Sequence, residues 1–272
     1  MSGWRKVAPA IWSHPRDPQI YGELDVDATP ILRFIEEARA ADGAHVTVTH
    51  VVGRAIAFTL ARHPDLNCSL ARRRFVQRET VDISFVVAVD GGRDLSSVKV
   101  RNADRKSAVE IARELAERAS RVRSGDDAEF GGAKRLIDRT PTGLLHLGFR
   151  AADWITGDLR IDLRRWGLPR DGFGSAMVTS VGMFGVQRAY APLSPYYRVP
   201  FIALVTEISE RPVALDGEVV VRPMLGITAT MDHRYLDGAH AARLANTLRE
   251  YLADPAAHEP AVRTSSAATT GS

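Results

Sequence analysis

Four segments of the chain carry apolar residues three or four positions apart, the spacing that places them on one face of a helix. Two of these segments also have a sequence signal at their start. Thr29 followed by Pro30 is typical of an N-cap with proline at the first helical position, and Ser107 with Glu110 has the spacing of a capping box. The pattern predicts helices over residues 29–43, 49–63, 107–122 and 239–254.

A fifth segment, from Gly143 to Trp166, is basic and amphipathic. Its large apolar residues are Leu144, Leu145, Leu147, Trp154, Ile155 and Trp166. A basic amphipathic stretch can lie on a membrane surface, but packing against the protein or against another subunit is the commoner use of such a pattern. We expect packing or a subunit contact for this segment.

Short runs rich in β-branched residues predict strands between the helices. Residues 75–89 end in ISFVVAV, a run typical of a strand buried on both faces, and a turn follows at Asp90-Gly91-Gly92. Asp216-Gly217, between two further runs, is a strong hairpin signal. After Pro169 we expect strands over residues 176–181, 201–208, 213–223 and 224–231. Long antiparallel stretches with helices between them predict an α+β sandwich.

The composition is that of an ordinary soluble globular protein. Of the 272 residues, 45% are hydrophobic and 25% are charged, and the length allows one large domain or two small ones. The most apolar stretch, residues 46–60, is too short to span a membrane, and the first residues contain no signal-peptide pattern. The last residues, 256–272, are small and polar, so we expect a folded domain over residues 1–255 and a disordered tail.

The net charge and the cysteine content indicate the cellular compartment and limit the classes of partner that we expect. The formal net charge of +3 is too small to indicate nucleic-acid binding, although it would not repel an anionic ligand. The single cysteine, Cys68, cannot form an intrachain disulfide, and no neighbouring residue marks it as reactive. No P-loop and no dinucleotide-binding glycine motif is present. We therefore expect a cytoplasmic protein with neither nucleic acid nor membrane among its partners.

The segment TATMDHRYLDGAHAARL contains the strongest candidate for chemistry. A predicted strand ends at Met231 and a helix begins near Gly238, so His233 and Asp237 lie on the connecting loop. Histidine can take a proton from a thiol or hydroxyl near neutral pH, and a nearby carboxylate can hold the ring or the loop in place. The alternative is that Asp237 is only an N-cap and His233 an ordinary histidine. No third ligand accompanies His233 at a spacing that suits a metal ion.

VTSVGMFG is the second candidate. Thr179 and Ser180 close a predicted strand before Gly182, and a hydroxyl held there could donate a hydrogen bond to a developing oxyanion. The segment lacks the G-x-S-x-G elbow of a serine hydrolase, so we interpret the hydroxyl as a donor and not as a nucleophile. Threonine and serine are also common in strands and turns, so the segment alone is a weak signal.

Taken together, these segments resemble one protein family. DHRYLDG is similar to the DHRxxDG signature of the 2-oxo acid dehydrogenase acyltransferases, whose catalytic domain shares its fold with chloramphenicol acetyltransferase. VTVTHVVGRAIAFTLARHPDLN resembles the helix before the family's H-P-x-x-N, and MVTSVGMFGV resembles its S/T-N-x-G-x-x-G segment. The resemblance extends over about residues 4–255. It implies a chloramphenicol acetyltransferase-like, two-layer α+β sandwich, with a mixed sheet and flanking helices.

The resemblance implies acyl transfer between the thiols of coenzyme A and dihydrolipoamide. His233 would be the general base, Thr179 would hydrogen-bond the tetrahedral oxyanion, and Asp237 would fix the loop. Coenzyme A, as acyl-CoA, would be a substrate, and no metal is implied. Family members place this site between two subunits of a homotrimer, and some build trimers into a 24-subunit cubic assembly.

The chain departs from the family pattern in three respects. Thr179-Ser180 stands where the family has S/T-N, so either hydroxyl could face the oxyanion. Residues 144–166 match poorly, and no D-K-A lipoylation motif is present, so a lipoyl group would act only in trans, on a carrier protein. Two functions stay open. One is an acyltransferase that uses a coenzyme A thioester, which the presence of His233 favours, and the other is a self-assembling cage or scaffold with little or no catalysis.

Overall fold

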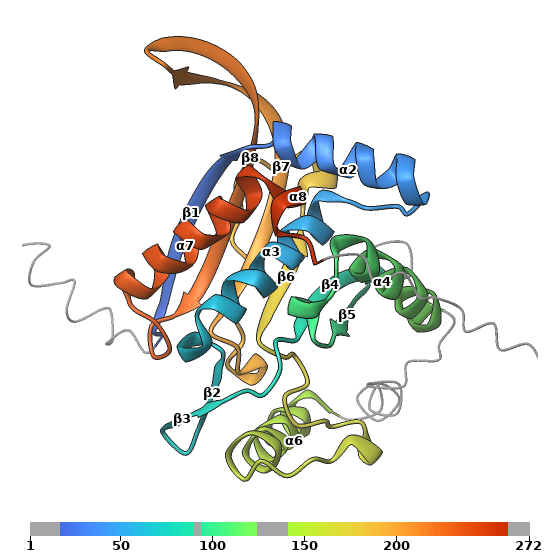
Figure 1. Cartoon of the computed structure of the whole chain (residues 1–272). Helices are drawn as coiled ribbons and strands as arrows, with labels where there is room; N and C mark the ends of the chain where they lie inside the picture. Colours follow the sequence, from blue (N-terminus) through green and yellow to red (C-terminus); the bar gives the residue numbers. More distant parts are fainter. Residues whose placement is uncertain (1–16, 90–93, 124–140, 261–272) are drawn as a thin grey trace, which may run out of the picture.

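Six strands form one mixed sheet in the part of the chain that the computed structural model describes, residues 17–89, 94–123 and 141–260 (Figure 1). Their order across the sheet is β1-β8-β7-β6-β4-β5. β6 is parallel to both of its neighbours, β4 and β7, whereas the other pairs are antiparallel. The bounds are Gln19–Asp27 for β1, Ile83–Val89 for β4, Asp94–Val100 for β5, Ala176–Ser180 for β6, Phe201–Leu215 for β7 and Glu218–Asp232 for β8.

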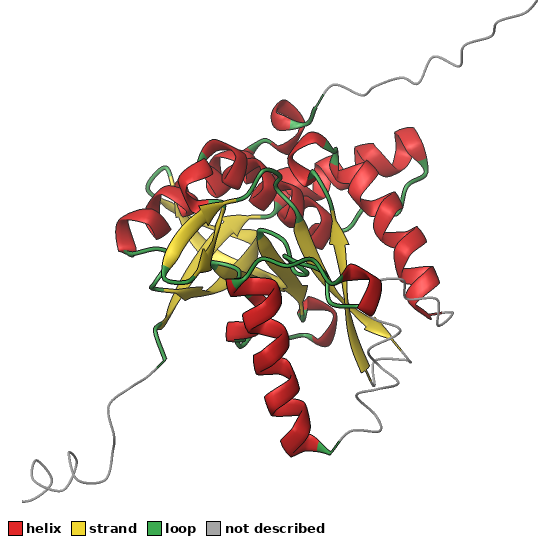
Figure 2. Cartoon of the chain, turned by 90° about the horizontal axis from the view of Figure 1, so that it is seen from below, coloured by secondary structure: helices red, strands yellow, loops and turns green. Residues whose placement is uncertain are grey.

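Helices cover one face of this sheet, as Figures 1 and 2 show from two directions. They are α2 (Thr29–Asp42), α3 (Val48–Arg62), α4 (Ala108–Arg123) and α7 (Gly238–Ala253). The main hydrophobic core lies between the two layers and includes residues of all four helices. Gly53 allows α3 to approach β4 closely, because a Cβ atom there would lie 2.3 Å from the ring of Phe85. The predicted two-layer α+β sandwich with a mixed sheet is confirmed.

The predicted helices form, and their local signals are largely confirmed. The Ser107 hydroxyl accepts the Glu110 N–H, and the Glu110 carboxylate accepts the Ser107 N–H, which completes the predicted capping box. The predicted N-cap at Thr29 is wrong by one residue. Ala28 is the N-cap of α2, and the Thr29 N–H is satisfied from outside the helix, at 2.8 Å, by the carboxylate of Asp27.

The predicted single strand over residues 75–89 is wrong. β3 (Arg74–Gln77) pairs with β2 (Cys68–Ala71) in a separate hairpin, and β4 belongs to the main sheet. Residues 78–82, between β3 and β4, connect the hairpin to the main sheet. The Arg78 N–H donates to Asn67 O at 2.9 Å and the Ala103 N–H to Val81 O at 2.8 Å, so this crossing has its own backbone hydrogen bonds.

The predicted break between strands 213–223 and 224–231 is also wrong. β8 runs without interruption from Glu218 to Asp232. Pro223 does not interrupt it, although proline cannot donate to a strand ladder, and its carbonyl accepts the Ala28 N–H at 2.8 Å. The predicted hairpin at Asp216-Gly217 is confirmed. Both residues have positive φ, 51° and 86°, as the tight turns of β-hairpins require. The tip of this β7–β8 hairpin projects beyond the sheet (Figure 1).

The ordered fold continues past residue 255, the predicted end of the domain. α8 (Pro255–His258) follows α7 directly, and the carboxylate of Glu259 accepts the Ala108 N–H at 2.9 Å and the hydroxyl of Tyr251. Of the predicted disordered tail, residues 261–272 lie outside the described residues, as does the predicted turn at residues 90–92.

α6 (Thr142–Asp153) stands apart from the helical layer and projects from the other side of the sheet (Figure 2). A π-helical turn, Trp154–Asp158, follows it. Leu144 and Leu147 on α6 are 60% and 64% exposed, so the predicted packing of this segment is incomplete within one chain. None of the described helices is long and apolar enough to cross a membrane.

Candidate active site

His233 lies on the loop between β8 and α7, as predicted, and the backbone of that loop is held on two sides. The His233 N–H donates to Pro18 O, and the Asp232 N–H donates to Pro200 O, each at 2.9 Å. The side chain of His233 is exposed and makes no hydrogen bond within the described part of the chain. The loop therefore presents an imidazole outward from a fixed backbone.

The neighbours of His233 fix the loop through side chains. Asp232 is buried, and its carboxylate accepts hydrogen bonds from the Arg234 backbone at 2.9 Å and from the Arg234 guanidinium at 2.6 and 3.0 Å. Because the bonds to Asp232 stabilise the charged guanidinium, they raise the pKa of Arg234. The hydroxyl of Tyr235 accepts the Leu70 N–H at 3.0 Å, which ties the loop to the β2–β3 hairpin.

Asp237 is the N-cap of α7 and does not reach His233. Its carboxylate accepts the His240 N–H at 3.0 Å and lies 2.6 Å from His240 Nδ1. The backbone hydrogen bond from His240 is the main reason that the pKa of Asp237 is lowered. The structural alternative for Asp237, a helix cap, is thus confirmed. Its carboxylate can fix the end of the loop, but it does not orient the imidazole of His233.

Thr179 and Ser180 form the carboxyl end of β6, and both are half-buried. They pair with Leu204 and Val205 of β7. The strand cannot continue unchanged, because Gly182 lies so close to β7 that a Cβ atom there would be 2.6 Å from Thr206 O. A short 3-10 turn, Gly182–Phe184, follows directly. The two hydroxyls therefore lie at the carboxyl end of an interior strand of the sheet, next to a tight turn.

A single chain does not bring the histidine and the hydroxyls together. Leu204 of β7 pairs with Thr179 on one side and with Thr228 of β8 on the other. From Thr228 the chain continues along β8 and away from that level, and His233 lies five residues further on. At about 3.3 Å per strand residue, the two candidate groups lie on the order of 15 Å apart along the strand direction.

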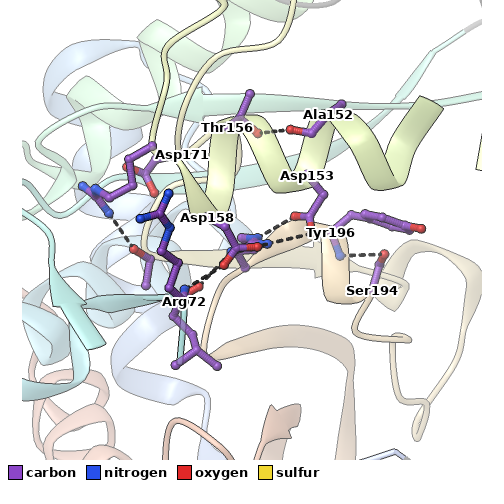
Figure 3. A network of polar contacts seen from close by, with 12 residues as sticks. Arg72, Ala152, Asp153, Thr156, Asp158, Asp171, Ser194 and Tyr196 are labelled. Atoms are coloured by element: carbon purple, nitrogen blue, oxygen red, sulfur yellow. Dashed lines mark hydrogen bonds and ion pairs between the residues drawn. The ribbon is translucent and has the colours of Figure 1, made fainter. Parts of the chain in front are cut away.

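Arg198 forms a charged cluster that the sequence did not indicate, and Figure 3 labels its two carboxylate partners, Asp153 and Asp158. Its guanidinium donates to Asp153 at 2.5 and 2.7 Å, to Asp158 at 2.8 Å and to Leu70 O at 2.8 Å. The hydrogen bonds to these carboxylates raise the pKa of Arg198, and the bond from Arg198 lowers the pKa of Asp158. Arg198 is 40 or more positions away in sequence from each of these partners, so no local spacing could have predicted the cluster.

Two cavities meet at Arg198. The first, of about 390 Å³, lies beside the histidine loop and is lined by Asp232 and Arg234 together with residues 17–19, 193–195, 198 and 199. The second, of about 440 Å³, lies between α6 and the loop before β7. Cys68 belongs to neither cavity. It is buried, and burial raises the pKa of its thiol, which agrees with the lack of any sequence signal for a reactive cysteine.

This fold and loop are those of an acyltransferase catalytic domain. The family model of the 2-oxoacid dehydrogenases acyltransferase (catalytic domain) matches residues 7–133 and 171–258. The chain belongs to this family. The match omits residues 134–170, the region of α6 that was expected to fit the family poorly.

The relatives of the chain are larger proteins. The dihydrolipoyllysine-residue acetyltransferase component of the acetoin cleaving system of Bacillus subtilis is 26% identical over 94% of this chain and 55% of its own length. The chain thus spans about half the length of the curated relatives it matches.

Two solved structures confirm the fold. The cubic core of the pyruvate dehydrogenase multienzyme complex superposes with a TM-score of 0.65 and 25% identity, over 89% of this chain and 84% of that chain. The dihydrolipoamide acetyltransferase of Azotobacter vinelandii also has a TM-score of 0.65, with 24% identity over the same shares. A shared architecture at this level of identity does not by itself assign a substrate.

Proposed function

We propose that the protein is an acyltransferase that moves an acyl group between coenzyme A and a thiol carrier such as dihydrolipoamide. One observation carries the proposal: an exposed histidine on a fixed loop at one end of the sheet, and a pair of hydroxyls at the end of β6, several residues away along the strand direction. Groups so far apart can act on one thioester only if a second copy of the chain brings its hydroxyl end to the histidine end of the first.

The resemblance to the family implies that this second copy belongs to a homotrimer with three shared sites. The similarity to the cubic core of the pyruvate dehydrogenase complex supports a larger form, a 24-subunit cubic assembly. The acyl donor would be an acyl-CoA, and the acceptor a lipoyl group presented in trans, free or on a carrier protein. The single cysteine favours the reducing cytoplasm as the working compartment.

In the proposed reaction, the imidazole of His233 accepts the proton of the attacking thiol. The thiolate sulfur then forms a bond to the thioester carbonyl carbon, and the carbonyl electron pair moves to its oxygen. Thr179 or Ser180 of the neighbouring subunit donates a hydrogen bond to this oxyanion. When the tetrahedral intermediate collapses, the original carbon–sulfur bond breaks, and the leaving thiolate takes the proton back from His233.

Asp237 has an indirect part in this proposal, because its carboxylate caps α7 and so fixes where the loop ends. The Azotobacter vinelandii protein was studied for the roles of a serine, a histidine and an asparagine in its catalytic mechanism, with the histidine and the asparagine four positions apart. His233 and Asp237 have the same spacing. Asparagine is as good an N-cap as aspartate, which supports a capping role for this position.

The alternative is a self-assembling scaffold with little catalysis. The similarity to a cubic core supports it as well, because that similarity bears on assembly and not on rate. The two functions differ in what they require of His233. A scaffold assembles equally well without the imidazole, whereas the enzyme loses its base.

Subunit mixing tests the proposal. His233→Ala and Thr179→Val homo-oligomers are each expected to be nearly inactive in acyl transfer from acetyl-CoA to dihydrolipoamide. After verified subunit exchange, activity should reappear, because mixed interfaces regenerate intact sites. His45→Ala, a change at an exposed histidine in the loop between α2 and α3, is the matched control and should keep full activity. No recovery in the mixture would exclude a shared site.

A further inference from the structure

The second cavity beside Arg198 is lined in large part by a segment that the family model does not match. Nine of its 17 lining residues lie between positions 149 and 169, inside the segment that the family match omits. Its volume of about 440 Å³ is within the range of small-molecule pockets, roughly 300–1,000 Å³. The proposed acyl transfer does not account for this pocket.

Aromatic rings supply much of the pocket wall. Phe149 of α6 and Tyr196 face each other with ring centroids 5.9 Å apart, and Phe173 packs against Tyr197 at 4.7 Å. Figure 3 shows Tyr196 lying alongside α6 and the acidic residues that bind Arg198. A wall of this kind favours a ligand with an aromatic or aliphatic body, which gains by leaving water.

Of the charged side chains that line the pocket, all but one are paired with an opposite charge within the described part of the chain. Arg198 is paired with Asp153 and Asp158, and Asp171 is paired with Arg78. Arg160 also lines the pocket, and its guanidinium donates to the Ser69 hydroxyl at 3.1 Å. Among the residues that the structure describes, Arg160 has no carboxylate partner. An anionic group on the ligand would supply one.

The backbone of the pocket is held in an unusual conformation. Three of its lining residues, Arg160, Asp171 and Arg198, have positive φ of 56°, 56° and 50°. Such angles are unfavourable for non-glycine residues and persist where the surrounding structure enforces them, often at binding sites. Gly157 also lines the pocket, and it lies so close to Arg198 that a Cβ atom there would be 2.2 Å from the guanidinium.

From this arrangement we propose that the pocket between α6 and residues 194–198 binds a small carboxylic acid with an apolar body, either aromatic or of medium chain length. The hydrocarbon lies among Phe149, Phe173, Tyr196 and Tyr197, and the carboxylate pairs with Arg160. The site does not depend on the proposed acyl transfer. It adjoins the histidine loop, because Arg198 lines both cavities and donates to Leu70 O, while the Leu70 N–H donates to Tyr235.

Calorimetry with octanoate as the probe tests the site, and octanamide, which has the same body without the charge, serves as the matched probe. Octanoate should bind the full-length protein, and octanamide should bind more weakly. Arg160→Gln should weaken octanoate binding about tenfold or more, since a hydrogen bond to a charged group contributes roughly 1.5–3 kcal/mol, and should leave octanamide binding unchanged. Arg164→Gln, at a nearby arginine that lies outside this pocket, is the control and should bind octanoate as the wild type does.

Thr156→Trp should abolish binding of both probes by filling the pocket, and Ala152→Phe serves if that variant does not fold. His233→Ala should bind octanoate normally, which separates this proposal from the acyltransferase mechanism. No octanoate binding by the wild-type protein at 10 mM would overturn the proposal, and so would equal binding by the wild type and Arg160→Gln.

Discussion

The loop of His233, here the histidine end, and the end of β6 with its two hydroxyls, here the hydroxyl end, are built differently. At the histidine end, hydrogen bonds to Pro18 and Pro200 hold the loop backbone, and buried Asp232 binds Arg234. At the hydroxyl end, β6 stops after five residues and leads into a turn in which Met183 is 80% and Phe184 67% exposed. One end is internally braced, and the other leaves large apolar side chains uncovered beside its hydroxyls. The exposed apolar side chains beside the hydroxyls support the proposal that a second copy of the chain covers this region.

Removal of the base is expected to have the largest effect. His233→Ala should lower kcat for acyl transfer by about 10²–10⁴-fold, because a positioned general base contributes about that much to proton transfer. The exposed side chain makes no contact that stability needs, so the melting temperature should stay the same. A thiol-release assay with acetyl-CoA, together with thermal unfolding, measures both. Full activity in this variant would favour the scaffold.

The hydroxyl end should respond next most strongly, and there the two candidates can be separated. Thr179→Val is expected to lower kcat by about 10²–10³-fold with little change in KM, because an oxyanion donor acts mainly on the transition state. Ser180→Ala is the matched change at the neighbouring position and should have a small effect. The reverse result would assign the oxyanion to Ser180.

Asp232→Asn tests the bracing of the histidine end. The substitution keeps the shape of a buried side chain and removes the charge that Arg234 binds. We expect a loss of about 1–2 kcal/mol in the free energy of unfolding, below the full value of a charged hydrogen bond because Arg234 is half-exposed. Urea unfolding measures this loss. An unchanged stability would show that the backbone bonds to Pro18 and Pro200 suffice.

The smallest effect is expected at Asp237, whose lowered pKa makes a specific pH prediction. A carboxylate with a lowered pKa in the folded state stabilises the fold above its unfolded pKa, and this contribution is lost as the pH falls through the folded pKa. Asp237→Ala should therefore lower the melting temperature slightly near neutral pH and have little effect well below pH 4. Asp237→Asn should keep the cap and most of the stability. Thermal unfolding across pH 2–7 compares the three proteins.

Local patterns predicted the elements well where the signal spans one or two turns. The capping box of Ser107 and Glu110 and the hairpin at Asp216-Gly217 formed as expected, because each depends on atoms within a few residues. The errors occur where distant residues decide. Residues 75–89 are divided between a hairpin and the main sheet, and the crossing between them is held by partners such as Asn67 and Ala103.

The candidate site shows the same division. The DHRYLDG segment was sufficient to place His233 and Asp237 on one loop, since a strand ends before it and a helix begins after it. The sequence did not decide the partner of Asp237, which proved to be His240 on the first turn of α7. An aspartate four residues after a histidine can either orient the imidazole or cap the following helix, and the spacing is the same in both cases. Only the direction of the aspartate side chain distinguishes the two roles.

By itself, then, the sequence determined the helices and most of the strands of a two-layer sandwich, the family, and the residue types available for acyl transfer. Only the tertiary structure decided that His233 and Thr179 lie far apart within one chain and that Arg198 joins α6 to the neighbourhood of the histidine loop. The physical reason is range. Caps, turns and amphipathic periods are set by atoms a few residues apart, whereas strand order and buried ion pairs depend on which distant segments pack together.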